Sequence, residues 1–295
     1  MLATVWLSWG FAYPLTGIAL DGLDPWTLRC AVMLLGGSTL LTIAALRGQR
    51  LAVPRVLWRD LVIGAIFNMT LFQVGMMFGV YFMGAGRTSV LIYTMPIWSA
   101  LFARWLLGEA ITPRRALALA LGALAVVVLL GQSLTQVRNA PLGALLTLGS
   151  AASFGFGTVW TKRTAWPLDL TVLGGWQILV SGLPYLPFWL FELPEARFLQ
   201  APLNTWLSVL YLALFSNALA YFAWLRLVRV LPASVLGVGT LIVPCVGVLS
   251  SALLIGETIQ RNDVIALVLV CGALGLVLFE PHRPAALRPE PDINM

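Results

Sequence analysis

Two segments of the chain carry nearly the same pattern, half a chain length apart. Residues 96–109 read PIWSALFARWLLGE and residues 244–257 read PCVGVLSSALLIGE, so each runs from a proline to a glycine–glutamate pair. The copies are shifted by 148 positions in a chain of 295 residues. Shorter matches flank them, SVL at 89–91 and 234–236 and GAL at 122–124 and 272–274. This internal duplication predicts a structure built from two similar halves.

The composition indicates that both halves lie in a membrane. Hydrophobic residues make up 60% of the chain and charged residues only 10%, whereas soluble domains have roughly 25% charged residues. Apolar segments of about 20 residues, the length that crosses a bilayer core, recur throughout. The sequence therefore predicts an all-α integral membrane protein with ten spans, at residues 2–20, 26–46, 58–81, 86–107, 114–131, 141–161, 169–191, 204–225, 232–255 and 262–280.

The basic residues between these spans predict how the chain is inserted. Alternate loops fall into two sets, one with 13 basic residues (Arg47, Arg50, Arg55, Arg59, Arg104, Arg114, Arg115, Lys162, Arg163, Arg226, Arg229, Arg283 and Arg288) and one with 5 (Arg29, Arg87, Arg138, Arg197 and Arg261). Because basic loops favour the cytoplasm, we expect an inner-membrane protein with both termini cytoplasmic. The net charge of +6 belongs to these loops and does not indicate nucleic-acid binding.

Five spans in each half force the two copies to point in opposite directions. The first half is predicted at residues 1–138 and the second at 139–280, followed by a polar, disordered tail at 281–295. The Gly108-Glu109 end of one copy faces the cytoplasm, and the Gly256-Glu257 end of the other faces outward. Such inverted repeats are typical of secondary transporters. The alternative is a chance match between two apolar helices.

The arrangement resembles the drug/metabolite transporter superfamily, in its ten-helix form with two EamA repeats. The Ser-Val-Leu, Pro and Gly-Glu blocks carry the resemblance, together with Ser8-Trp9-Gly10 and its echo ASFG at 152–155. The resemblance covers nearly the whole chain and implies two intertwined five-helix halves around a central cavity lined by spans 1, 3, 4, 6, 8 and 9. Members are mostly exporters of amino acids and other metabolites, and aromatic amino-acid exporters are the nearest match among them.

Polar and aromatic side chains within these spans are the candidates for a substrate cavity, because unpaired polar groups are costly in lipid. Aromatic rings joined by amides suit an aromatic or other neutral amino acid. The candidates are Trp9, Tyr13, Asn68, Gln73, Tyr81, Tyr93, Trp98, Trp160, Asn217 and Tyr221. Two alternatives remain open: the aromatics belong to belts at the membrane interfaces, or the amides form bonds between helices.

Two prolines are candidate hinges. Pro96 and Pro244 occupy corresponding places in the middle of spans 4 and 9. A proline inside a helix removes a backbone hydrogen bond and bends the helix. We expect these bends to open one side of the cavity or the other, although a static kink would give the same sequence.

What the spans lack narrows the mechanism. No Asp or Glu lies mid-span, and the one histidine, His282, is in the tail. Proton relays, intramembrane hydrolases and metal sites need such groups, so we expect an uncoupled or weakly coupled carrier without cofactor or metal, not an enzyme. Mid-span Lys or Arg is also lacking, which disfavours phosphate-bearing solutes. The expected partners are a small neutral solute and the bilayer, with a monomer as the working unit; a drug, sugar or nucleotide-sugar transporter is the alternative.

Overall fold

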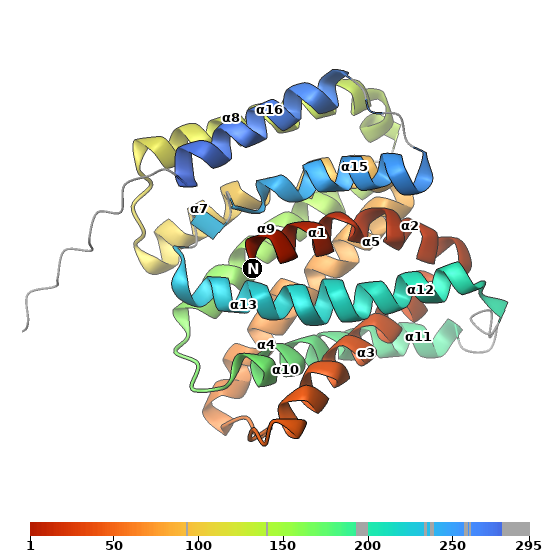
Figure 1. Cartoon of the computed structure of the whole chain (residues 1–295), viewed down its shortest axis with the longest axis vertical. Coiled ribbons are helices and arrows are strands. Elements are labelled where there is room, and N and C mark those ends of the chain that lie inside the picture. The colour runs from red at the N-terminus through yellow and green to blue at the C-terminus, as the bar shows by residue number, and fades with distance from the viewer. Residues whose placement is uncertain are drawn as a thin grey trace, which may run out of the picture.

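The computed structural model describes residues 1–92, 94–139, 141–192, 200–232, 235–236, 239–256, 259 and 261–278, and these residues contain helices but no strand (Figure 1). The predicted all-α class is confirmed. The α-helices are α1 (Leu2–Gly10), α2 (Ala12–Gly22), α3 (Pro25–Leu46), α4 (Trp58–Ala65), α5 (Leu71–Met83), α6 (Ala85–Ile92), α7 (Met95–Leu107), α8 (Pro113–Asn139), α9 (Pro141–Arg163), α10 (Leu170–Gly182), α11 (Leu186–Glu192), α12 (Leu203–Tyr211), α13 (Ala220–Val230), α15 (Val243–Ile255) and α16 (Arg261–Leu278). The predicted tail lies outside the described residues.

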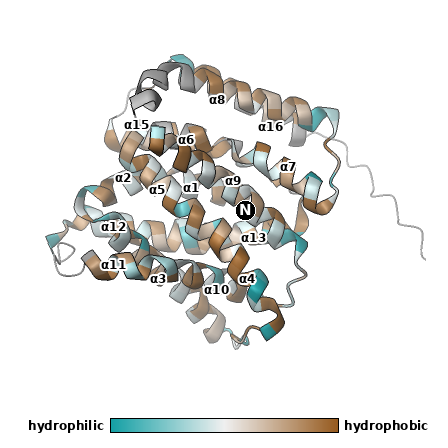
Figure 2. Cartoon of the chain, turned by 180° about the vertical axis from the view of Figure 1, so that it is seen from behind, coloured by the Kyte–Doolittle hydropathy of each residue, from teal (hydrophilic) through white to brown (hydrophobic). Residues whose placement is uncertain are grey.

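Four helical segments are long and apolar enough to cross a bilayer: Pro25–Leu46, Arg55–Met83, Pro141–Arg163 and Leu203–Val230. Several of the other predicted spans are divided, the first into α1 and α2 and the fourth into α6 and α7. Large apolar side chains lie on the outer surface, with Phe191 83% and Leu253 79% exposed. Figure 2 shows hydrophobic residues along the helices and hydrophilic ones mostly at helix ends and loops. The molecule is a helical membrane protein, and the count of ten spans stays a prediction.

The duplicated segments fold into two matching helices. α7 and α15 each have 13 residues, and each carries its proline in the second position. Each ends at a glycine with positive φ, +68° at Gly108 and +69° at Gly256. Glycine adopts this conformation without the steric cost that a Cβ brings, so the shared pattern specifies where both helices begin and end.

The placement of the prolines corrects one expectation. Pro96 and Pro244 do not bend a continuous helix, because each stands in the first turn of a separate helix. α6 ends at Ile92 before α7 begins, and a short 3₁₀ helix, Thr240–Ile242, precedes α15. A proline in the first turn removes no intrahelical hydrogen bond. An α-helix thus begins next to the proline, and does not run through it, at corresponding places in the two halves.

A second pair of matching features is a widened, π-helical segment. One covers Ile66–Thr70 between α4 and α5, and the other covers Leu212–Leu219 between α12 and α13. Asn68 lies in the first and Asn217 in the second. Such π-helical insertions are rare and are often found at functional sites.

The helix contacts come in matching sets. α8 packs on α16 at one edge of the bundle, and α3 packs on α10 at the opposite edge (Figure 1). Between these edges α9 packs on α5 and α7, while α1 and α2 pack on α12, α13 and α15. In terms of the predicted spans, span 6 contacts spans 3 and 4. Span 1, the counterpart of span 6 in the other half, contacts spans 8 and 9, which are the counterparts of spans 3 and 4. Exchanging the two predicted halves leaves this set of contacts unchanged.

Glycines bring helices of different halves into backbone contact. A Cβ added to Gly36 of α3 would lie 2.8 Å from the carbonyl oxygen of Ala213, in the second π-helical segment. A Cβ added to Gly157 of α9 would lie 2.6 Å from the backbone nitrogen of Asn68, in the first. Both separations are shorter than a carbon atom tolerates. The two π-helical segments are therefore held tightly against helices of the opposite half.

Candidate functional site

A small cavity lies where the two halves meet. Its polar lining consists of Tyr13, Arg29, Asn68, Gln73, Ser216, Asn217 and Thr240, and its larger apolar side chains include Trp9, Met69, Phe72, Met76, Phe154 and Leu212. The volume is about 50 Å³. That is room for a few water molecules, whereas benzene needs a cavity of about 150 Å³. A solute of amino-acid size therefore does not fit in this cavity as it stands in the structure.

A chain of hydrogen bonds crosses this cavity from one half to the other. Arg29 Nη1 donates to Gln73 Oε1 at 2.8 Å, and Gln73 Nε2 donates to Asn217 Oδ1 at 3.1 Å. Asn217 Nδ2 in turn donates to the Leu212 carbonyl at 2.9 Å within the π-helical segment. All three side chains are buried. Because hydrogen bonds strengthen one another in a low-dielectric interior, this chain fixes the orientation of both amides.

Aromatic side chains form one wall. Trp9 Nε1 donates to the Ser216 carbonyl at 3.0 Å, which ties α1 to the second π-helical segment. The Trp9 ring meets Phe154 edge-on at 5.7 Å between centroids, and Phe72 lies 4.8 Å from Phe154. Tyr13, one turn beyond Trp9, is 5% exposed and lines the same space. The wall combines aromatic area with a polar edge.

Asn68 has a different set of partners from Asn217. Its Nδ2 donates to Thr161 Oγ1 at 3.0 Å, and its Oδ1 accepts from Thr158 Oγ1 at 3.3 Å. Both threonines belong to α9, so the Asn68 amide joins two helices as well as lining the cavity. Of the ten predicted residues, the structure brings five to the cavity: Trp9, Tyr13, Asn68, Gln73 and Asn217.

The other predicted residues lie elsewhere. Tyr221 is fully buried beside the cavity wall, where its hydroxyl donates to Gln177 Oε1 at 2.7 Å. Trp98 stacks on Phe102. Tyr81 is 62% exposed on the outside of α5. Tyr93 lies outside the described residues.

Trp160 also lies away from the cavity, towards the end of α9. Its ring stacks on Phe156 with centroids 5.7 Å apart, and the Arg163 guanidinium lies 5.5 Å from the ring centroid. Aromatic side chains of this kind are common where a bundle meets the polar edge of a membrane. No cavity-lining contact is found for Trp160 in the described part of the chain.

The residue that the sequence interpretation missed is Arg29. Counted there among the basic residues of the loops, it instead lies in the second turn of α3, is 1% exposed and lines the cavity. The sequence interpretation considered Lys and Arg only in the middle of the spans and therefore overlooked this buried cation. A signal was present in the sequence: Arg29 falls inside the apolar segment 26–46, where a charged residue is rare and often functional.

The comparisons with known proteins agree with this geometry. The model of the EamA-like transporter family matches residues 1–131 and again residues 141–279. The chain belongs to this family. The uncharacterized transporter YvbV of Bacillus subtilis is 27% identical over 94% of this chain and 90% of its own length. A probable amino-acid metabolite efflux pump of Salmonella typhimurium is 27% identical over 67% of this chain and 68% of its own.

A solved structure supports the fold of this EamA-like protein. It is titled "Crystal structure of protein", superposes with a TM-score of 0.73 at 19% identity, and the match covers 93% of this chain and 94% of that one. At this identity the likeness concerns the fold alone. The chain is thus a membrane transporter of the EamA-like family, in the drug/metabolite transporter superfamily.

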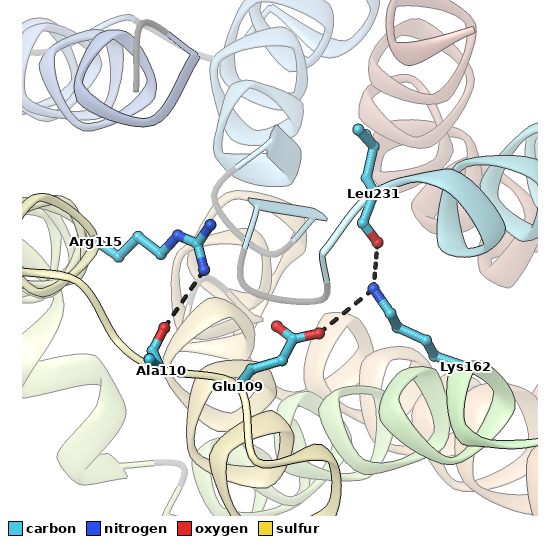
Figure 3. A network of polar contacts seen from close by, with 5 residues as sticks. All are labelled: Glu109, Ala110, Arg115, Lys162 and Leu231. Atoms are coloured by element: carbon cyan, nitrogen blue, oxygen red, sulfur yellow. Dashed lines mark hydrogen bonds and ion pairs between the residues drawn. The ribbon is translucent and has the colours of Figure 1, made fainter. Parts of the chain in front are cut away.

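At one end of the EamA-like bundle, a polar network joins the halves (Figure 3). Lys162, at the end of α9, lies with its Nζ 3.4 Å from Glu109 Oε1 and also donates to the carbonyl of Leu231, which follows α13. Beside it, Arg115 Nη1 donates to the Ala110 carbonyl at 3.4 Å. Glu109 is the glutamate of the duplicated pattern, while its counterpart Glu257 lies outside the described residues. The network ties together the ends of α7, α9 and α13.

Other features do not compete with the cavity as the site. A larger hollow of about 570 Å³ among α3, α10, α11 and α12 has an almost wholly apolar lining and opens to the outer surface, where Leu34 is 62% and Leu183 58% exposed. Within the described residues, no three His, Cys, Asp or Glu side chains come together as metal ligands would. Polar groups from both halves meet only in the central cavity among these spaces.

Proposed function

We propose that this EamA-like transporter exports amino acids, with aromatic and other neutral ones favoured, or similar small metabolites. The proposed path crosses the inner membrane by alternating access between two inverted halves, residues 1–138 and 139–280, with both termini in the cytoplasm. The observation that carries the proposal is the Gln73–Asn217 hydrogen bond inside the cavity. It joins amides of the two halves where a solute would pass.

The size of the cavity supports a moving mechanism. A space of about 50 Å³ cannot hold an amino acid, so the halves must separate before a solute binds. Separation breaks the Gln73–Asn217 bond and frees two amides to bind the solute in its place. Exchanging protein–protein for protein–solute hydrogen bonds keeps these groups paired, which limits the cost of opening.

The chemistry of the lining supports an amino acid as the solute. Trp9, Phe72 and Phe154 offer apolar and aromatic area, while the amides offer donors and acceptors for the polar end. The Salmonella relative, named a probable amino-acid metabolite efflux pump, favours the same class. The loop charges favour a cytoplasmic position for the Lys162 network, and we propose that this network closes the cytoplasmic side of the carrier.

The cavity lining also supports transport that is uncoupled from a proton gradient or only weakly coupled to one. None of the residues that line the described cavity is an Asp, Glu or His, and such groups carry proton relays in transporters. We therefore propose that the solute moves down its own gradient. A drug, sugar or nucleotide-sugar carrier is the second candidate, and buried Arg29 is the observation that keeps it open.

A flux panel in protein-containing liposomes tests the proposal. Radiolabelled phenylalanine, leucine, glutamate, a sugar, a nucleotide sugar and a cationic drug are each presented without any imposed pH difference. Uptake of phenylalanine and leucine above empty liposomes is expected. Uptake of the drug or nucleotide sugar alone would overturn the choice of substrate, and a strict need for a pH gradient would overturn the choice of mechanism.

A further inference from the structure

Arg29 is a buried cation without a counter-ion. It is 1% exposed, and the ion pair found among the described residues, Lys162 with Glu109, does not include it. Its Nη2 is buried and finds no hydrogen-bond partner among the described residues. A buried charge that is not paired is costly. The unpaired charge of Arg29 does not stabilise the fold, so its presence at this position indicates a role in binding a ligand.

The groups around Arg29 are neutral. Nη1 donates to Gln73 Oε1 at 2.8 Å. Nε donates at 3.4 Å to Met77 Sδ, and a thioether sulfur is a weak acceptor. The carboxylate nearest in sequence, Asp24, caps α3 by accepting from the backbone N–H groups of Trp26 and Thr27 at 3.0 and 2.8 Å. The N-terminal end of α3 adds positive, not negative, potential. The described groups around Arg29 therefore do not neutralise its charge, and a bound anion would do so.

We propose that Arg29 binds the carboxylate of the transported solute and that the carrier selects its substrates by this group. The inference rests on the proposed function and adds to it the chemical feature that is recognised. A guanidinium matches a carboxylate in charge and in the spacing of its donors. Nη2 is the donor available for this contact, and Gln73 holds the guanidinium in place.

The single charge favours a carboxylate over a phosphate. Arg29 is the only Lys or Arg that lines the described cavity. One guanidinium balances one carboxylate, whereas a phosphate group would carry up to a second negative charge into a low-dielectric space. The adjoining wall of Trp9, Phe72, Met76 and Phe154 suits an apolar or aromatic body.

The cavity lining also predicts that the amine of an amino acid contributes little to binding. No Asp or Glu lines the described cavity, so an ammonium group meets only neutral oxygens there. A neutral acceptor binds an ammonium group less strongly than a carboxylate does. The carboxylate and not the amine should therefore decide which compounds bind, and compounds with a carboxylate but no amine should be recognised.

Competition with three matched compounds tests this. Phenylalanine carries both groups, 3-phenylpropionate only the carboxylate, and phenylethylamine only the amine. In liposomes that take up labelled phenylalanine, unlabelled phenylalanine and 3-phenylpropionate should inhibit uptake, and phenylethylamine should be at least about tenfold weaker. In Arg29→Gln this difference should disappear, whereas Arg29→Lys should keep part of it. Equal inhibition by phenylethylamine, or an unchanged ranking in Arg29→Gln, would overturn the inference.

A control variant and a binding assay separate this result from misfolding and from failure of the proposed function. Arg47→Gln makes the same change at the exposed C-terminal end of α3 and should keep the wild-type ranking. If phenylalanine is not transported, thermal stabilisation by the three compounds is measured instead. Stabilisation of the wild-type protein by 3-phenylpropionate but not of a folded Arg29→Gln then supports the inference alone. If no carboxylate stabilises the wild-type protein, the inference fails.

Discussion

Lys162 and Glu109 form an ion pair across the two halves, with Nζ 3.4 Å from Oε1 and both side chains about a fifth exposed, at 23% and 19%. Lys162 also donates to the Leu231 carbonyl. The Lys162 side chain thus connects α9 with Glu109, which lies just beyond the end of α7, and with Leu231, which follows α13 (Figure 3). In the proposed alternating-access cycle, opening of this end breaks both contacts.

Lys162→Gln should therefore favour the form that is open at this end. Partly exposed ion pairs contribute up to about 1 kcal/mol, which shifts a two-state equilibrium about fivefold. The populations are measured from the distance between spin labels on exposed Trp105 of α7 and Val230 of α13, in a cysteine-free background. Arg163→Gln, at the adjacent position, is the control and should leave the distances unchanged.

The reversed pair Glu109→Lys with Lys162→Glu gives an independent check. It restores opposite charges at the same positions, although the Leu231 carbonyl loses its donor. Recovery of part of the closed population is expected. If neither Lys162→Gln nor the reversal changes the distances, the ion pair does not hold this end closed.

Gly157 should be essential to the contact between α9 and the first π-helical segment. In Gly157→Ala the new Cβ would lie 2.6 Å from the Asn68 backbone nitrogen and 2.9 Å from its Oδ1. Overpacking of this kind costs about 1–3 kcal/mol, so the melting temperature in detergent should fall. Gly149→Ala, on the same helix, meets nothing within 4 Å and should leave stability equal or slightly raised. Equal melting temperatures for both variants would contradict the close approach.

Asn217 and Tyr221 lie one turn apart, and the structure gives them different roles. Asn217→Ala removes the acceptor of Gln73 Nε2 in the cavity, so it should lower the apparent affinity for phenylalanine several-fold. Tyr221→Phe removes a hydroxyl that donates to Gln177 outside the cavity and also interacts with Asn68, which should cost about 0.5–1.5 kcal/mol of stability and lower the affinity much less than Asn217→Ala does. Flux at varied substrate concentration and thermal unfolding measure the two effects. An equal loss of affinity in Tyr221→Phe would place its hydroxyl in the substrate path.

The helical fold and the matching helices follow directly from the sequence. The proline in the first turn and the glycine at the end of α7 and of α15 act locally, through a fixed φ and a positive φ, so their duplication was visible in the chain. The π-helical segments, in contrast, were not visible in the sequence. An inserted residue in a helix leaves no clear composition signal, although Asn68 and Asn217, which lie in the two segments, were both candidates for the cavity.

Which face of each helix turns inward was harder to predict. Lipid and protein core are both apolar, so hydrophobic spacing does not separate them in a membrane helix. Tyr81 faces outward while Trp9 faces the cavity, although both were candidates. Arg29 was missed because span boundaries are uncertain by a few residues, and it lies near the start of its span. Its buried side chain donates to Gln73, a contact that the sequence does not show.

The helix breaks at Pro96 and Pro244 give the last prediction. An alanine at either position supplies a backbone N–H that can donate to the residue four positions earlier, Ile92 or Thr240, and so join the two helical pieces. Pro96→Ala and Pro244→Ala should therefore keep or raise the melting temperature, while the added bond of about 1 kcal/mol slows transport about fivefold if the break must flex. Pro141→Ala, at the exposed first residue of α9, is the control and should change neither quantity. Unchanged flux in both variants alongside a raised melting temperature would show that the interruptions are static.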